Sequence, residues 1–180
     1  MKKTLLNAAL IAGFGIAAFA SQAASAASTG TINFTGKVYK DTCVITVNGG
    51  STVTLPTVAT SAFASTSGTA LTSSATPFTI ALSSCDNNLV SAAMAFSGTN
   101  IDTTTGNLKN SLTSNNSNVE IQLLNSSGAA INTNTGANAP TIAIATGAGS
   151  TQLTAQYITN STSTTAGLVS SSVGFTLTYN

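Results

Sequence analysis

The chain has 180 residues, of which only 5% carry charge, and it contains no histidine, tryptophan or arginine. With so few ionisable side chains, metal-ligand clusters, Ser/His/Asp triads and Cys/His nucleophile pairs cannot be assembled from this chain alone. The formal net charge of +1 provides no basic field for nucleic acid, and the usual guanidinium contacts to phosphates and bases are missing. The composition argues against an enzyme, against a metal or other cofactor, and against a nucleic-acid partner.

The first 26 residues have the pattern of an export signal. Lys2 and Lys3 precede an uncharged apolar stretch, residues 8–20, that is too short to span a bilayer. The small-x-small sequence 24–26 follows it, so we predict a signal peptide over 1–26 and a mature start at Ala27, with Ala24 as a second option. A retained membrane anchor, the alternative, needs a longer apolar run. Removal of 26 from 180 residues leaves 154, enough for one domain of ordinary size.

The chain has two cysteines, Cys43 and Cys85. An even pair in an exported chain predicts one disulfide, formed in an oxidising compartment. In the chain-entropy model, closing a loop of about 43 residues stabilises the fold by roughly 4 kcal/mol. Two free thiols or an intermolecular bridge are the alternatives.

Apolar and polar residues alternate with period 2 in several short segments, and no segment of the mature chain keeps a period of 3.6 for three turns. Such alternation predicts half-buried strands. Ser-, Thr-, Gly- and Asn-rich stretches separate these segments and predict loops, with a hairpin turn at 125–128. We therefore expect an all-β chain, folded as an immunoglobulin-like sandwich. The predicted strands are 31–38, 52–55, 78–82, 119–123, 153–157 and 173–180, and the predicted loops are 61–74, 103–118, 131–140 and 160–172.

Three stretches in order around the cysteine pair carry a family resemblance. They are GTINFTGKV at 30–38, leading to Cys43; CD at 85–86, continued by AFSGT at 95–99; and FTLTYN at 175–180. With these stretches the chain resembles the major structural subunits of chaperone-usher fimbriae, among them the rod subunits of type 1 pili.

The resemblance implies an incomplete immunoglobulin-like β-sandwich, the pilin fold, which is completed by a donor strand from a neighbouring subunit. It implies a homopolymer of pilin subunits, a periplasmic chaperone that first lends a strand, and an outer-membrane usher that organises the exchange. The expected location is a surface fimbrium of a Gram-negative bacterium, reached through the periplasm and mediating adhesion. Residues 27–36 are then the donor-strand extension and 37–180 the pilin domain.

The alternation at the mature N-terminus has the pattern of a donor strand. Gly30, Ile32 and Phe34 fall on one face, and the residues between them are polar. Main-chain hydrogen bonds give such an added strand its affinity, and its alternate side chains give it specificity. The resemblance suggests Gly30 as the small residue at which exchange begins. The alternative is that this segment is an ordinary first strand of its own domain.

The C-terminal segment places Phe175, Leu177 and Tyr179 on one face, and the sequence ends at Asn180. An apolar last strand without a partner is an aggregation liability unless another chain covers it. The resemblance implies that these four residues form the chaperone-recognition element, with basic chaperone residues holding the carboxylate of Asn180. The alternative is that the three apolar residues are core residues of a complete sandwich.

Other candidate sites have weaker support in the sequence. Asp86, Asp102 and Glu120 offer the carboxylates of a glycosidase pair, but nothing in their spacing places two of them across a cleft. Asp86, next to a cysteine, fits a turn better than a ligand site. Two other functions stay open: a secreted carbohydrate-binding adhesin domain and a minor adaptor pilin.

Overall fold

The computed structural model describes residues 33–35, 43–47 and 51–180. The chain divides into two units, 1–37 and 38–180, and every strand described below belongs to the second. The predicted signal peptide, Gly30 and Ile32 lie outside the described residues. Of the strand expected over 31–38, only 33–35 are described, and these three belong to no strand. Within the described ranges, no helix is long and apolar enough to cross a membrane.

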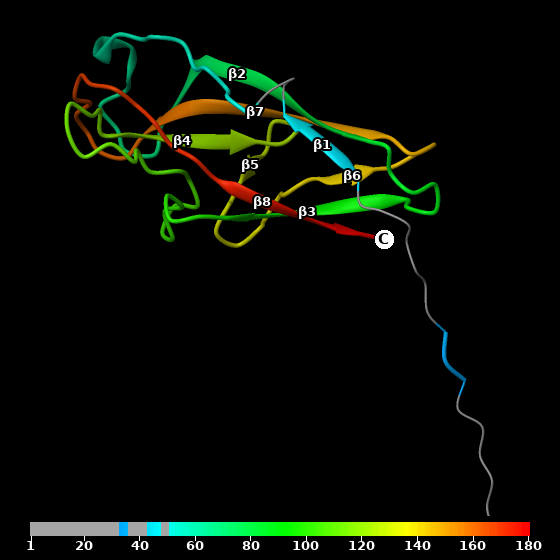
Figure 1. The fold of residues 1–180 in the computed structure, drawn as a ribbon. Helices are drawn as coiled ribbons and strands as arrows, with labels where there is room; N and C mark the ends of the chain where they lie inside the picture. The colour runs from blue at the N-terminus through cyan, green and yellow to red at the C-terminus, as the bar shows by residue number, and fades with distance from the viewer. Residues whose placement is uncertain (1–32, 36–42, 48–50) are drawn as a thin grey trace, which may run out of the picture. The chain divides into compact units, whose positions relative to one another are not determined.

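The described part of the second unit consists of strands and one short 3-10 helix (Figure 1). In chain order these elements are β1 (Val44–Val47), η1 (Thr60–Ala62), β2 (Ala70–Ser83), β3 (Ser91–Ser97), β4 (Val119–Leu124), β5 (Ala130–Ile131), β6 (Thr141–Ala143), β7 (Gly149–Thr159) and β8 (Gly174–Tyr179).

The strands form two antiparallel sheets. The larger has the order β1-β2-β7-β4-β5 and the smaller the order β6-β3-β8, and they lie as two layers in Figure 1. Apolar side chains from both sheets fill the space between the layers, including Leu82, Leu153 and Ile142, which are at most 2% exposed. Each such side chain contributes about 1.5–3 kcal/mol by its removal from water. The predicted all-β sandwich is confirmed.

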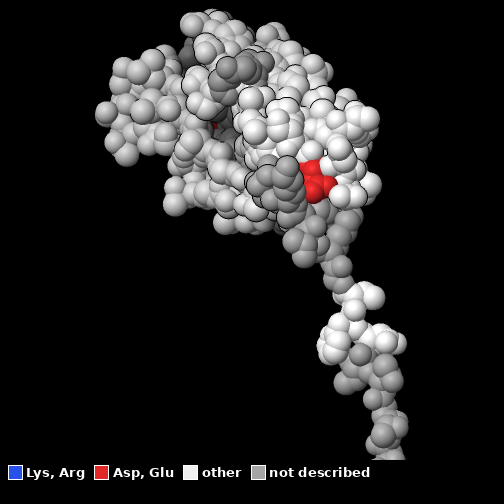
Figure 2. Space-filling model, turned by 45° about the vertical axis from the view of Figure 1, so that its right-hand side comes forward, with Lys and Arg blue, Asp and Glu red and all other residues white. Residues whose placement is uncertain are grey.

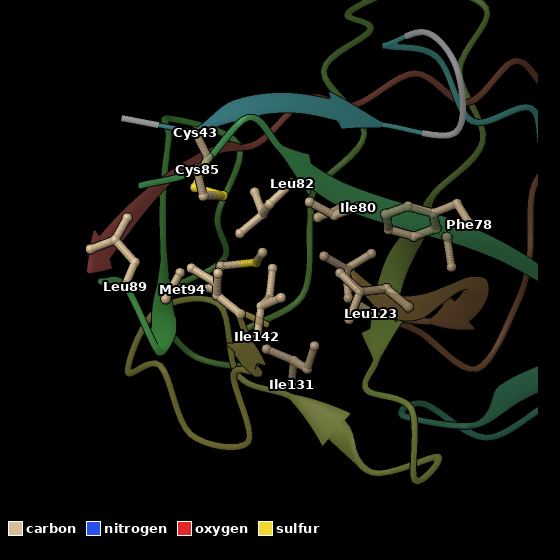
Figure 3. Close-up of a cluster of buried hydrophobic side chains, with 14 of the residues drawn as sticks. Cys43, Phe78, Ile80, Leu82, Cys85, Leu89, Met94, Leu123, Ile131 and Ile142 are labelled. Atoms are coloured by element: carbon tan, nitrogen blue, oxygen red, sulfur yellow. A yellow bond between two sulfur atoms is a disulfide. The ribbon is translucent and has the colours of Figure 1, made fainter. Parts of the chain in front are cut away.

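The disulfide lies at one end of this core, as Figure 3 shows. Cys43 and Cys85 are bonded to each other, so the residue before β1 is tied to a residue just after β2. Both cysteines are buried in the main apolar cluster. The predicted intramolecular bridge is confirmed, and free or intermolecularly bridged thiols are excluded.

Three of the predicted strands, 78–82, 119–123 and 153–157, fall within observed ones, the predicted strand 173–180 extends β8 by one residue at each end, and the hairpin turn at 125–128 joins β4 to β5. The strand expected at 52–55 is wrong, because that segment has no partner strand. The predicted loop 61–74 is too long, because β2 already begins at Ala70. Alternation did not indicate β3, which is rich in alanine, a residue with little preference for strands.

Candidate strand-binding groove

The smaller sheet ends in an open edge. β8 pairs with β3 on one side, from Ala92 opposite Tyr179 to Ser97 opposite Gly174. In the described part of the chain no strand pairs with its other side. An edge strand of this kind exposes a row of unpaired backbone N–H and C=O groups.

In residues 168–180 the backbone N–H and C=O groups of even-numbered residues point to one side of the chain, and those of odd-numbered residues point to the other. The N–H groups of Leu168, Ser170 and Asn180 all donate to partners on the side of β3 and of the loop after it. The odd-numbered Val169 and Ser171 make no backbone hydrogen bond to a described residue. Because antiparallel pairs alternate between bonded and non-bonded positions, the odd residues through Tyr179 direct their N–H and C=O groups to the open side.

The side chains of the same odd residues point inward. Val169, Val173, Phe175, Leu177 and Tyr179 are half-buried and pack against the main core cluster. We call residues 164–179 the rear wall. Its odd positions from 169 to 179 cover about 34 Å at roughly 3.4 Å per residue.

A second extended segment, residues 51–59, faces the rear wall, and we call it the front wall. Val53, Leu55 and Val58 are half-buried. Residues 51–58 make no backbone hydrogen bond to a described residue, and Pro56 has no N–H to donate. The front wall therefore also offers free backbone groups.

Two adjoining cavities lie between the walls. The first, about 320 Å³, has an apolar floor that includes Ile80, Ile121 and Leu153, and is bordered by Val53 on one wall and Val173 on the other. The second, about 570 Å³, lies between residues 55–60 and 164–169. Leu55 borders both cavities, so they adjoin along the same two walls, and we call them together the groove. Leu168 lies at the rim of the groove and its side chain is 60% exposed, although removal of such an apolar side chain from water is favourable.

This arrangement suits one kind of ligand. Two extended walls with free N–H and C=O groups, above an apolar floor, match an extended polypeptide that alternates apolar and polar side chains. We therefore treat the groove as the candidate functional site.

The structure brings together only some of the predicted site residues. Phe175 lines the first cavity, and Leu177 and Tyr179 continue the same inward row. The backbone oxygen of Asn180 accepts hydrogen bonds from the N–H groups of Val90 (2.8 Å) and Ser91 (3.4 Å). Phe34 is 89% exposed.

Sequence reasoning missed both walls as parts of a groove. The alternation at 52–55 was seen but assigned to a paired strand. In the predicted loop 160–172, the apolar Val169 continues the row that begins at Val173, with Ser171 between them. Extending the period of β8 backward would have identified this part of the rear wall.

The three carboxylates that the structure describes, Asp86, Asp102 and Glu120, all accept hydrogen bonds from turn or loop residues. Glu120 is buried and accepts hydrogen bonds from Thr105 Oγ1 (3.0 Å) and Asn107 Nδ2 (3.1 Å). Asp102 Oδ1 accepts from the N–H groups of Thr105 (3.1 Å) and Thr104 (2.7 Å). These two N–H groups lower the pKa of Asp102 below its usual value. A charged carboxylate is thus used to hold a turn.

Asp86 is also a turn residue, as predicted: its Oδ1 accepts hydrogen bonds from the N–H and the side-chain amide of Asn88, both at 2.8 Å. Within the part of the chain that the structure describes, no three His, Cys, Asp or Glu residues lie close enough to hold a metal ion. The face shown in Figure 2 is almost entirely uncharged where it is described. The described part of this face therefore has no charged patch that would indicate a second site.

Comparison with known proteins gives a consistent result. The family model described as "Fimbrial protein" matches residues 32–180. An F17 fimbrial protein of Escherichia coli is 41% identical over 175 residues, which cover 92% of this chain and 95% of the relative. A major fimbrial subunit of Stenotrophomonas maltophilia is 34% identical and covers 89% of this chain and 98% of the relative. The crystal structure of an antigen and type I fimbria protein of Burkholderia pseudomallei is similar with a TM-score of 0.54 and 29% identity, covering 84% of this chain and 99% of that one.

Proposed function

The chain belongs to the fimbrial protein family and is a structural subunit of a fimbria, and we propose that its groove accepts residues 27–36 of a neighbouring copy. The resemblance seen in the three sequence stretches is confirmed by these matches. Fimbrial relatives from Gram-negative bacteria imply assembly with other pilin subunits in a surface fimbrium. The proposal adds how one subunit joins the next.

The open groove is the observation that carries this proposal. The odd residues of the rear wall provide about 34 Å of unpaired strand edge, and a ten-residue extended segment is about 33 Å long. The apolar floor of the first cavity suits the inward pair Ile32 and Phe34. Burial of each contributes roughly 1.5–3 kcal/mol, and each ladder hydrogen bond adds about 0.5–1.5 kcal/mol. A segment of this length bonded to both walls is therefore held tightly.

Before a neighbour arrives, the groove needs another cover, since an open apolar edge promotes aggregation. We propose that a periplasmic chaperone first lends a strand here and that an outer-membrane usher organises its replacement. Phe175, Leu177, Tyr179 and Asn180 form the recognition element, because they lie at the open edge and at the end of the rear wall. On this proposal Tyr179→Ala lowers the recovery of chaperone-bound subunit.

The proposal is tested by placing a charge on the inward face of the donor segment. Ile32→Asp and Phe34→Asp bring a carboxylate into an apolar groove, which costs several kcal/mol. If these residues insert into a neighbouring copy, the fold of their own subunit does not depend on them. We expect chaperone-bound subunit in the periplasm at normal yield and little or no fibre, measured by co-purification and fibre yield from one culture.

The matched control is Asn33→Asp, which puts the same charge on the outward face of the same segment. It should leave fibre yield near the wild-type level. If Ile32→Asp abolishes both the chaperone complex and the fibre, residues 27–36 are an internal strand, and the proposed donation is rejected.

A further inference from the structure

The rear wall is supported in two different ways along its length. From Gly174 onward it is part of β8 and pairs with β3. No strand of the described residues lies behind residues 164–173, because β3 ends at Ser97, opposite Gly174. This upstream part nevertheless borders both cavities, so something else must hold it in an extended conformation.

The side chain of Asn110 takes the place of a neighbouring strand. Its Nδ2 donates to the carbonyl oxygen of Leu168 at 2.8 Å, and its Oδ1 accepts from the N–H of Ser170 at 3.0 Å. A peptide group of a paired strand bonds in the same way, with one donor and one acceptor. The same Nδ2 also donates to the carbonyl oxygen of Ser117 at 2.8 Å, which ties this amide to the loop before β4.

Asn118 holds the wall a few residues further upstream. Its Oδ1 accepts from the N–H of Thr165 at 2.9 Å. Its Nδ2 donates to Ser161 Oγ at 2.9 Å and to the carbonyl oxygen of Ser163 at 2.7 Å. One amide thus fixes the wall at Thr165 and also holds the residues that lead into it, Ser161 and Ser163.

The loop and the wall also approach each other closely at Gly167. A Cβ atom added there would lie 2.3 Å from the carbonyl carbon of Asn116. On either side of this approach, Leu168 N–H donates to Asn115 O and Ser117 N–H donates to Leu168 O. The two asparagine side chains therefore flank a short backbone contact that Gly167 makes possible.

We propose that Asn110 and Asn118 are positioning residues for strand exchange, an inference that rests on the function proposed above. Their amides engage the backbone of Thr165, Leu168 and Ser170, and so set which residues face the groove. A shift by one residue would turn Val169 and Val173 outward and direct the wrong backbone groups to the incoming strand. The two asparagines thus prepare the upstream half of the groove before the donor segment arrives.

The test measures how fast an open subunit takes up a donor segment. The full chain carrying Ile32→Asp serves as background, so that its own segment does not compete, and the probe is a fluorescent peptide of wild-type residues 27–36. We expect Asn110→Ala and Asn118→Ala each to slow peptide uptake at least tenfold. In the free subunit, hydrogen exchange should become faster at the N–H of Ser170 and Thr165 respectively, and stay unchanged at Asn180.

The matched control is Asn125→Ala. Asn125 Oδ1 accepts from the N–H groups of Ser127 (3.1 Å) and Ala129 (3.0 Å) in the β4–β5 turn and lines neither cavity. Its loss should leave the uptake rate unchanged. If an alanine variant does not fold, Ser111→Ala replaces it, removing only the bond from Ser111 Oγ to the carbonyl oxygen of Ser170 (2.9 Å); a slower uptake is expected again.

A purely structural role predicts a different result. It would lower the melting temperature of the peptide-filled subunit as much as that of the free one, with an unchanged uptake rate per folded subunit. That outcome, or equal rates for all variants, overturns the positioning role and leaves the proposed function standing. If the background subunit takes up no peptide at all, the proposed function fails and this inference fails with it.

Discussion

The two walls of the groove are held in opposite ways. The rear wall is bonded along its back, first by side-chain amides and then by β3. The front wall has no backbone hydrogen bond to a described residue over 51–58 and is held by half-buried side chains such as Val53 and Leu55. Segments with few backbone bonds and partial burial open at low free-energy cost. We therefore expect the rear wall to act as the template and the front wall to close onto the strand that pairs with it.

Removing the disulfide gives the largest expected effect. Cys43→Ser combined with Cys85→Ser should lower the free energy of unfolding by about 2–5 kcal/mol. The front wall begins only a few residues after β1, which the bridge holds at one end, so limited proteolysis should become faster within 51–58 than within 174–179. Urea unfolding and mass spectrometry of the cleaved fragments measure the two effects. An equal increase in cleavage in both segments would contradict the difference between the walls.

Truncating one apolar side chain on each wall compares them directly. Burying part of a large side chain contributes a fraction of the 2–5 kcal/mol seen for full burial, so Leu55→Ala and Phe175→Ala should each cost about 1–2 kcal/mol in the free subunit. With donor peptide bound, the cost of Leu55→Ala should rise, because the front wall packs fully only then. The cost of Phe175→Ala should change less on peptide binding, because the rear wall is already held in position in the free subunit.

Thermal unfolding of each variant with and without the peptide of residues 27–36 measures this difference. Thr54→Ala, at an exposed front-wall residue that lines neither cavity, is the control and should cost little in either state. If peptide binding raises the stability cost of Phe175→Ala more than that of Leu55→Ala, the assignment of template and closing wall is reversed.

Gly167→Ala tests the close approach behind the rear wall. The added Cβ would meet the backbone of Asn116 at 2.3 Å, and an overlap of this kind costs about 1–3 kcal/mol when the backbone must move. We expect lower stability and slower peptide uptake together. Thr162→Ala, at an exposed position before the wall that lines neither cavity, should have neither effect. Wild-type stability for Gly167→Ala would show that the rear wall is not fixed as described.

The smallest effect is expected at Pro56. Its exposed ring restricts the unfolded chain, so Pro56→Ala should cost about 0.4–1 kcal/mol. The new N–H gives the front wall one more donor, and the affinity for the donor peptide should stay the same or rise slightly. Calorimetry of peptide binding measures this change. A large loss of affinity would mean that the front wall is rigid before the peptide binds.

The sequence by itself determined the class of fold and the covalent frame. Alternation at 78–82, 119–123 and 153–157 lies within β2, β4 and β7, because these strands each bury one face in the core. The two cysteines predicted the bridge that the structure contains. Local pattern was sufficient here, since burial of alternate side chains is a property of each segment taken alone.

Only the tertiary structure decided which extended segments have partners. Residues 52–55 alternate like a strand, but alternation records which side chains are buried and says nothing about where the backbone hydrogen bonds go. The support of Ser170 by Asn110 joins residues 60 positions apart, and no local pattern marks such a pair. The groove is therefore recognised only from the positions of both walls and from the absence of a described strand between them.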